Sequence, residues 1–160
     1  MHVIAAKAAG FLEALRPDFQ DYIKSVLSNA KILAETLKNN GFKIYSGGTD
    51  THLMVVDLRP FNVKGNLAAE SLCRANITCN KNGIPFDTES PMVTSGIRLG
   101  SQAATTRGFG LKEFEMVGQL ITKVIKGLSS NPEDNSKVEN EVRQEVIELC
   151  SKFPIYKHLG

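Results

Sequence analysis

The amino-acid sequence predicts an α/β fold in which a small mixed sheet is covered by helices, an arrangement of α+β layers. Long stretches with apolar residues at helical spacing alternate with short apolar runs bounded by glycine, proline and aspartate. The chain also has 160 residues, of which 42% are hydrophobic and 22% charged, which is enough to bury one core of ordinary size. Amphipathic helices that alternate with short strands along the chain favour a domain in which helices cover a sheet.

Two helices are expected at the start of the chain, separated by Pro17. Residues 3–15 are compatible with a helix and are apolar on nearly every face, so we expect them to be buried against another domain or subunit. Pro17 disfavours the helical conformation at Arg16 and marks a break. Apolar residues recur at helical spacing over residues 19–40, and Gly41 stands where the end of a helix favours a left-handed residue.

The central segment is predicted to supply the sheet. Strands are expected at residues 42–46, 53–58, 77–79 and 96–99, and a helix at residues 66–74. The stretch "GGTDT" has the residues of a tight turn, and "NGIPFDTESP" is expected to be an irregular loop because proline and glycine interrupt regular structure. The stretch "SQAATTRG" after the last strand is expected to be a loop of small residues.

Two further helices are expected at the C-terminal end. The first follows Gly110 and carries an apolar stripe over residues 114–128. The second begins at Ser136, which forms a capping-box signature with Glu139, and it ends at Pro154.

Composition and charge exclude several classes of protein. The net charge of +2 is small and dispersed, which argues against a nucleic-acid partner, and no apolar run approaches the roughly 20 residues that span a membrane. The first segment lacks the basic leader and cleavage region of a secretory signal. Cys73, Cys79 and Cys150 lie in apolar segments without metal-ligand spacing, so we expect buried, reduced thiols in a cytosolic protein.

The stretch "TSGIRLGSQAATTRG" places Arg98 inside a short apolar strand between glycines. A guanidinium in such a strand requires an anionic partner. One interpretation pairs Arg98 with an internal aspartate, which would make this arginine structural. The other offers its planar fork to the carboxylate of a small molecule, an arrangement that lysine cannot reproduce. The residues alone leave both interpretations open.

A second group of candidates lies in the irregular loop. Asn82 is either a turn residue or an amide that reads the edge of a heterocycle. Ser90, Pro91 and Met92 close the same loop, where a hydroxyl and an adaptable thioether are suited to lining a flat ligand.

Four segments, "HVIAAKA", "SGGTDTHLMVVDLR", "RANITCNKNGIP" and "SPMVTSGIRLGSQAATTRG", together closely resemble the serine hydroxymethyltransferase family. The resemblance runs from the first residues to about Tyr156. It implies an enzyme of the aspartate-aminotransferase-like fold that uses pyridoxal phosphate (PLP) as cofactor and tetrahydrofolate as co-substrate. Such an enzyme interconverts serine and tetrahydrofolate with glycine and 5,10-methylenetetrahydrofolate, and the family implies a cytoplasmic homodimer.

The resemblance also implies that the chain is the C-terminal portion of such an enzyme. Residues 1–16 are then an interdomain helix of the truncated large domain, and residues 17–160 are the C-terminal small domain. The threonine-rich motif that carries the Schiff-base lysine is missing, and neither Lys7 nor Lys81 sits in such a motif. The fragment alone is therefore expected to be inactive, with no catalytic, cofactor-binding or metal-binding residue of its own.

By position, Arg98 matches the arginine that grips the α-carboxylate of the amino acid in this family. Asn82 matches the amide side chain that contacts the folate ring system, and Ser90, Pro91 and Met92 match a short folate-binding stretch. The family commonly has Ser-Pro-Phe there, so Met92 keeps the pocket apolar but removes an aromatic ring. Two alternatives remain: the small domain of another PLP enzyme such as an aminotransferase, and a stand-alone binding or oligomerisation module.

Overall fold

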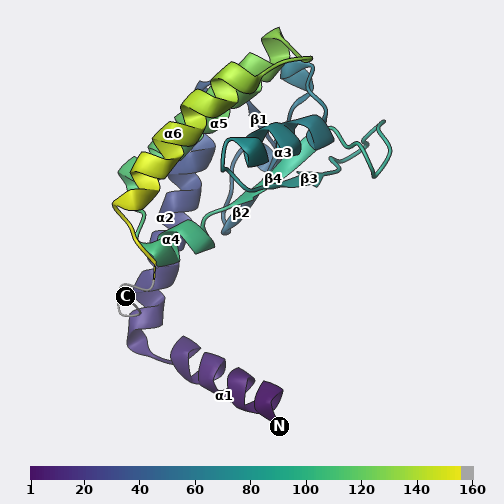
Figure 1. Cartoon of the computed structure of the whole chain (residues 1–160). Coiled ribbons are helices and arrows are strands. Elements are labelled where there is room, and N and C mark those ends of the chain that lie inside the picture. Colours follow the sequence, from purple (N-terminus) through teal and green to yellow (C-terminus); the bar gives the residue numbers. More distant parts are fainter. Residues whose placement is uncertain (156–160) are drawn as a thin grey trace.

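A computed structural model describes residues 1–155 and confirms the α/β class (Figure 1). The helices are α1 His2–Ala14, α2 Pro17–Asn39, α3 Gly65–Arg74, α4 Gln102–Arg107, α5 Leu111–Ser130 and α6 Ser136–Ser151. The strands are β1 Lys43–Ile44, β2 Leu53–Asp57, β3 Asn80–Asn82 and β4 Gly96–Gly100, and the short 3-10 turns are η1 Tyr45–Gly47 and η2 Arg59–Phe61. None of the helices within the described residues is long and apolar enough to cross a membrane.

The four strands form one sheet in the order β1-β2-β4-β3, and every neighbouring pair is antiparallel. The expectation of a mixed sheet is therefore wrong in this respect. Helix α3 connects β2 to β3, as in a parallel crossover, and these two strands do run in the same direction. However, β4 lies between them and runs against both, so no parallel pair forms.

One face of the sheet carries the core. Apolar side chains of β2 and β4 on this face pack with those of α2, α3 and α5, and α6 adds an outer layer (Figure 1). The largest fully buried side chains are Val26, Leu33, Leu37, Val56, Leu58, Leu72, Ile97, Phe114, Ile121, Val124, Ile125 and Val142. The helical stripes predicted for α2 and α5 therefore form most of the core.

Local backbone chemistry explains the ends of α2. Arg16 is extended (φ −74°, ψ 146°) and Pro17 occupies the first helical position, where a missing N–H is tolerated. Gly41 has a φ of +94°, as expected for the residue that ends a helix in the left-handed region. Both predictions are confirmed.

Three predicted elements differ from the structure. The strand expected at residues 42–46 is shortened to β1, because Tyr45–Gly47 form the 3-10 turn η1. The strand expected at residues 77–79 is wrong, because Asn76 adopts a φ of +62° and the N–H of Ile77 bonds Leu72 to close α3. Pairing with β4 begins only at Asn80. The loop of small residues expected after β4 is instead the short helix α4, whose first turn is held by a hydrogen bond from the Thr105 hydroxyl to Ser101.

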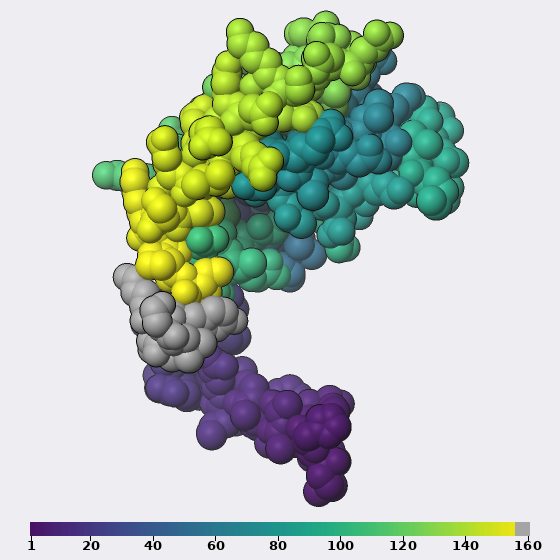
Figure 2. Space-filling view, viewed as in Figure 1, coloured from purple at the N-terminus to yellow at the C-terminus, as the bar shows by residue number. Residues whose placement is uncertain are grey.

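Helix α1 is confirmed as a helix, and it projects away from the rest of the chain (Figures 1 and 2). None of its residues is buried within the described chain, although most of them are apolar. Its largest exposed apolar side chains are Val3, Ile4, Phe11 and Leu12. An apolar helix without a partner leaves an exposed surface of the kind that normally packs against another part of a protein.

The capping box expected at Ser136 is wrong. The backbone N–H of Ser136 instead donates to the carboxylate of Asp134 (3.0 Å). Glu139 turns away from the start of α6 and accepts hydrogen bonds from the Ser71 hydroxyl (2.6 Å) and from Arg74 Nε (2.6 Å). Glu139 of α6 thus forms a hydrogen-bonded ion pair with Arg74 of α3 in place of the capping contact with Ser136, and this pair joins the two helices.

The substitution Glu139→Gln tests this connection. The hydrogen bond from Arg74, opposed by burial and supported by Ser71, holds the pKa of Glu139 below its ordinary value of 4.5. A carboxylate with a lowered pKa contributes stability above pH 4.5 and loses it as the pH falls through the folded-state pKa. We expect the substitution to lower the free energy of unfolding at pH 7 by about 1–2 kcal/mol.

This difference should shrink at pH 3, measured by urea unfolding at both pH values. Glu141→Gln is the control, because Glu141 of α6 forms an exposed pair with Lys123 of α5 and should contribute little. An equal difference at pH 7 and at pH 3 would contradict the role given to the Glu139 charge.

Candidate functional site

The candidate site lies on the open face of the sheet, opposite the core. Successive side chains of a strand point to opposite faces. Ile97 and Leu99 of β4 are buried in the core, so Gly96, Arg98 and Gly100 lie on the other face. Because its neighbours on that face are glycines, Arg98 is the one side chain that β4 extends there.

The antiparallel register brings Asn82 to the same face as Arg98. Arg98 is directly opposite Val55 of β2 and Asn80 of β3. Asn82 follows Asn80 by two residues and therefore points the same way, opposite Gly96. Diagonal neighbours of this kind are about 7–8 Å apart. Arg98 and Asn82 are thus within reach of one small ligand.

Arg98 is not paired with an internal aspartate. Its side chain is exposed, and it forms no hydrogen bond or ion pair with any other residue among residues 1–155. The buried carboxylate on this face, Asp57, is bound instead by Arg59, with Nη2 2.7 Å from Oδ2. Burial raises the pKa of Asp57, but the hydrogen bonds and charge of Arg59 outweigh it, so the pKa lies below its ordinary value. The structural interpretation of Arg98 is therefore wrong within the described chain.

An open groove of about 750 Å³ runs beside Arg98. Its walls are one side of α2, the turn at residues 46–51 and the exposed side of β2. Lys38 of α2 donates to the carbonyl of Gly47 (2.7 Å) and so fixes the turn that forms one wall. The guanidinium thus faces a solvent-filled space that is wide enough for a small organic anion.

Asn82 is half-buried and is the last residue of β3, directly before the irregular loop. Its side-chain amide donates to the carbonyl of Gly83 (2.6 Å). The contact is with the next residue of the chain. The other polar atom of the side chain, Oδ1, accepts no hydrogen bond from the described residues and is available to a ligand. Asn82 is therefore suited both to shaping the turn and to bonding a ligand on the open face.

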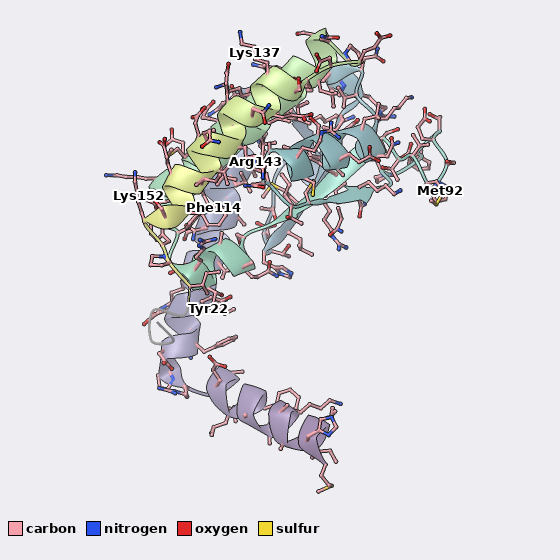
Figure 3. The ribbon with its side chains drawn as sticks, viewed as in Figure 1. Tyr22, Met92, Phe114, Lys137, Arg143 and Lys152 are labelled. Carbon is pink, nitrogen blue, oxygen red and sulfur yellow. The ribbon has the colours of Figure 1, made fainter. Side chains whose placement is uncertain are left out.

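The Ser90–Pro91–Met92 segment lies elsewhere. All three residues are exposed, and the Met92 side chain is 73% exposed at the outer end of the loop (Figure 3). Lys81, which alternates with Asn82 and so points to the opposite side of β3, donates to the carbonyl of Met92 (2.7 Å). The structure brings Arg98 and Asn82 together and does not place these three residues beside them.

Analysis of the sequence missed Asp87 as the organiser of the loop. Its carboxylate accepts hydrogen bonds from the backbone of Ile84 and Glu89 and from both the backbone and the hydroxyl of Ser95. Burial raises the pKa of Asp87, but these bonds, led by the Ser95 hydroxyl, lower it well below its ordinary value. The available signal was an aspartate in a loop rich in Gly and Pro, where Asp commonly bonds nearby backbone.

The structure gives no support for metal or thiol chemistry. No group of three or more potential metal ligands occurs within residues 1–155. Cys73, Cys79 and Cys150 are free thiols, but Cys73 is exposed, so the prediction that all three are buried is wrong. Burial raises the pKa of Cys79 to about 11, which keeps this thiol protonated and unreactive at neutral pH.

The glycines beside Arg98 are required by close contacts. A Cβ on Gly96 would lie 2.7 Å from Ile84 Cγ2 and 2.7 Å from the carbonyl oxygen of Val56, and one on Gly100 would lie 2.9 Å from Leu53 Cδ2. Fold and site together define an α/β domain whose open sheet face carries an exposed Arg98 guanidinium beside an open groove.

Comparison with known proteins identifies the family. A family model described as serine hydroxymethyltransferase matches residues 1–121. The chain is 85% identical over 159 residues to serine hydroxymethyltransferase of Pelagibacter ubique (strain HTCC1062), covering 99% of this chain and 36% of that protein. It is 63% identical over 157 residues to serine hydroxymethyltransferase of Marinomonas sp. (strain MWYL1), covering 98% and 37%. The chain belongs to the serine hydroxymethyltransferase family, and it spans just over a third of the length of these relatives.

Replacing Gly96 by alanine tests the tight packing of the open face. The new methyl group would meet backbone oxygen as well as Ile84, so we expect Gly96→Ala to lower the free energy of unfolding by about 1–3 kcal/mol. Gly48→Ala is the control, since nothing lies within 4 Å of a Cβ at Gly48 and its φ of 171° is extended. Equal unfolding midpoints in urea for these two variants would contradict the packing described here.

Proposed function

We propose that this chain acts as the C-terminal part of a PLP-dependent serine hydroxymethyltransferase. The parent enzyme interconverts serine and tetrahydrofolate with glycine and 5,10-methylenetetrahydrofolate. The observation that carries the proposal is the Arg98 guanidinium, which has no partner within residues 1–155 and lies on the open sheet face of a chain of this family. Serine and glycine each present the α-carboxylate that such a group binds.

Arg98 is proposed to hold the α-carboxylate of the amino acid. Two parallel N–H···O bonds fix the carboxylate in one plane, and hydrogen bonds to charged groups contribute roughly 1.5–3 kcal/mol each. Because Arg98 is held in strand β4, the bound carboxylate is held in a fixed orientation as well. The rest of the amino acid can then rotate about fewer bonds. The residue thus positions the substrate for the bond that is broken.

Asn82 is proposed to contact the folate ring system. Its place on the Arg98 face of the sheet supports this role, since an amide offers both a donor and an acceptor to a heterocycle edge. Ser90, Pro91 and Met92 are proposed to contact folate as well. Because all three are exposed and Met92 lies at the outer end of the loop, they suit a part of the ligand more distant from Arg98 than the part that meets Asn82.

The described residues do not fit PLP itself. A covalent PLP site requires a lysine, and the threonine-rich motif that carries the Schiff-base lysine in this family is missing from the chain. The two lysines of the sheet are engaged, since Lys43 lies 3.8 Å from the Asp57 carboxylate and Lys81 bonds the carbonyl of Met92. We therefore assign the cofactor to the part of the parent enzyme that this chain does not cover. The chain supplies the carboxylate anchor and the proposed folate contacts.

The proposal extends to domain organisation and assembly. Residues 1–16 are an interdomain helix that packs on the large domain, and residues 17–160 are the small domain, with residues 156–160 outside the described part. The exposed apolar surface of α1 supports this division. The parent is proposed to be a cytoplasmic homodimer, on the resemblance of the chain to its family.

A second candidate function follows from α1. A stand-alone binding or oligomerisation module would use the same exposed apolar helix to associate with another protein or with a second copy. Monomeric sedimentation of the chain at micromolar concentration would contradict an oligomerisation module and would leave the enzymatic proposal intact.

Arg98→Lys in the full-length parent enzyme tests the proposed function. A lysine keeps the charge but replaces a two-pronged contact by a point contact. We expect kcat/KM for serine to fall by about tenfold or more, which corresponds to roughly 1.4 kcal/mol. Arg143→Lys on the exposed side of α6 is the matched control and should leave kcat/KM unchanged. Normal serine turnover by Arg98→Lys would contradict the assignment.

The chain alone is expected not to bind PLP covalently. Mixing it with PLP and reducing with borohydride should give no stoichiometric adduct on a single lysine by mass spectrometry, because the motif that carries the Schiff-base lysine in this family is missing from the chain. The full-length parent, treated in the same way, serves as the positive control. A single stoichiometric adduct on one lysine of this chain would show that the assignment of the cofactor to the remainder of the parent is wrong.

A further inference from the structure

We propose that Asp87 is a positioning residue that sets Asn82 and Arg98 relative to each other and so couples the folate and amino-acid subsites. This inference rests on the proposed function for what the two subsites bind. The coupling itself rests on the geometry of the loop at residues 83–95, which begins directly after Asn82 and ends just before the strand of Arg98.

The Asp87 carboxylate joins the two ends of this loop. Oδ2 accepts the N–H of Ile84 (3.1 Å) and the N–H of Ser95 (2.9 Å), so one oxygen holds a residue from each end. Oδ1 accepts the Ser95 hydroxyl (2.6 Å) and the N–H of Glu89 (3.0 Å). Ile84 is two residues after Asn82, and Ser95 is three residues before Arg98.

Each loop end is in turn fixed to the sheet. The carbonyl of Ser95 accepts the N–H of Leu58, directly after β2 (3.0 Å). The Ile84 side chain lies so close to Gly96 on the open face that a Cβ there would meet it. A displacement of Asp87 would therefore move the start of β4 and the turn at Asn82 together.

The four donors around Asp87 are N–H and O–H groups, and no ion pair to Asp87 occurs among residues 1–155. Both carboxylate oxygens must act as acceptors at once. An asparagine keeps one acceptor and turns the other into an NH2 group, which in either orientation would face at least one backbone N–H donor. Asp87→Asn is therefore a specific disruption that keeps the size of the side chain.

The same loop offers two matched comparisons. Ser95→Ala removes the hydroxyl donor but leaves the three backbone bonds to Asp87. Glu89→Gln changes a carboxylate in the same loop whose side chain pairs with Lys64 at the surface, and such pairs contribute little. The order expected from the geometry is a large effect for Asp87→Asn, a smaller one for Ser95→Ala and none for Glu89→Gln.

The experiment uses the full-length parent enzyme with steady-state kinetics for both substrates. We expect Asp87→Asn to raise KM for tetrahydrofolate by about tenfold and KM for serine severalfold, with a smaller change in kcat. Ser95→Ala should raise KM for tetrahydrofolate about threefold, and its effect should disappear when Asp87 is already asparagine, because the two residues act through one contact. Glu89→Gln should stay within twofold of the wild type.

Hydrogen exchange followed by mass spectrometry supplies a readout that does not depend on activity. Asp87→Asn should lose protection in the peptide that covers residues 83–95, while peptides from α5 and α6 keep theirs. Unchanged KM values for Asp87→Asn would overturn the inference, as would a loss of protection throughout the protein, which would show a general structural role. If the wild-type enzyme fails to convert serine with tetrahydrofolate, the proposed function fails, whereas the exchange comparison still decides whether Asp87 holds the loop.

Discussion

The alternation of side chains along β4 is the constraint on which both the core and the site depend. Ile97 and Leu99 enter the core between the sheet and its helices, and this burial fixes the direction in which Arg98 must point. A shift of one residue in register would place the guanidinium in the core and two large apolar side chains in water. Packing energy on one face of the strand thus holds the charged group on the other.

Buried carboxylates in this domain are satisfied locally, which leaves Arg98 available to a ligand. Asp57 is bound by Arg59, and Glu139 is bound by Arg74 and Ser71. Asp87 is half-buried and differs from both because all its partners are uncharged backbone N–H groups and a serine hydroxyl. The first two carboxylates join neighbouring elements through ion pairs, and the third organises a loop. Asp57 lies on the open face itself, but its ion pair with Arg59 keeps it from pairing with Arg98.

The chain has two exposed surfaces of different kinds, one apolar and one that carries a positive charge. Helix α1 is apolar and projects from the rest of the described chain without a partner there (Figures 1 and 2). The open sheet face carries Arg98 beside an open groove. Apolar helices are normally buried, and a cationic side chain that becomes buried requires an anionic partner. Since the relatives are nearly three times as long as this chain, we infer that the remainder of the parent covers both surfaces.

The sequence by itself determined the α/β class, the ends of α2 at Pro17 and Gly41, and the placement of Arg98 on a short strand, because these depend on local periodicity and backbone chemistry. Its four motifs also identified the family. Only the tertiary structure decided the antiparallel sheet, since strand order depends on contacts distant in sequence. It also decided that Glu139 bonds Arg74 in place of capping its own helix, and that Asp87 joins both ends of its loop, because each carboxylate takes the donors that folding brings to it.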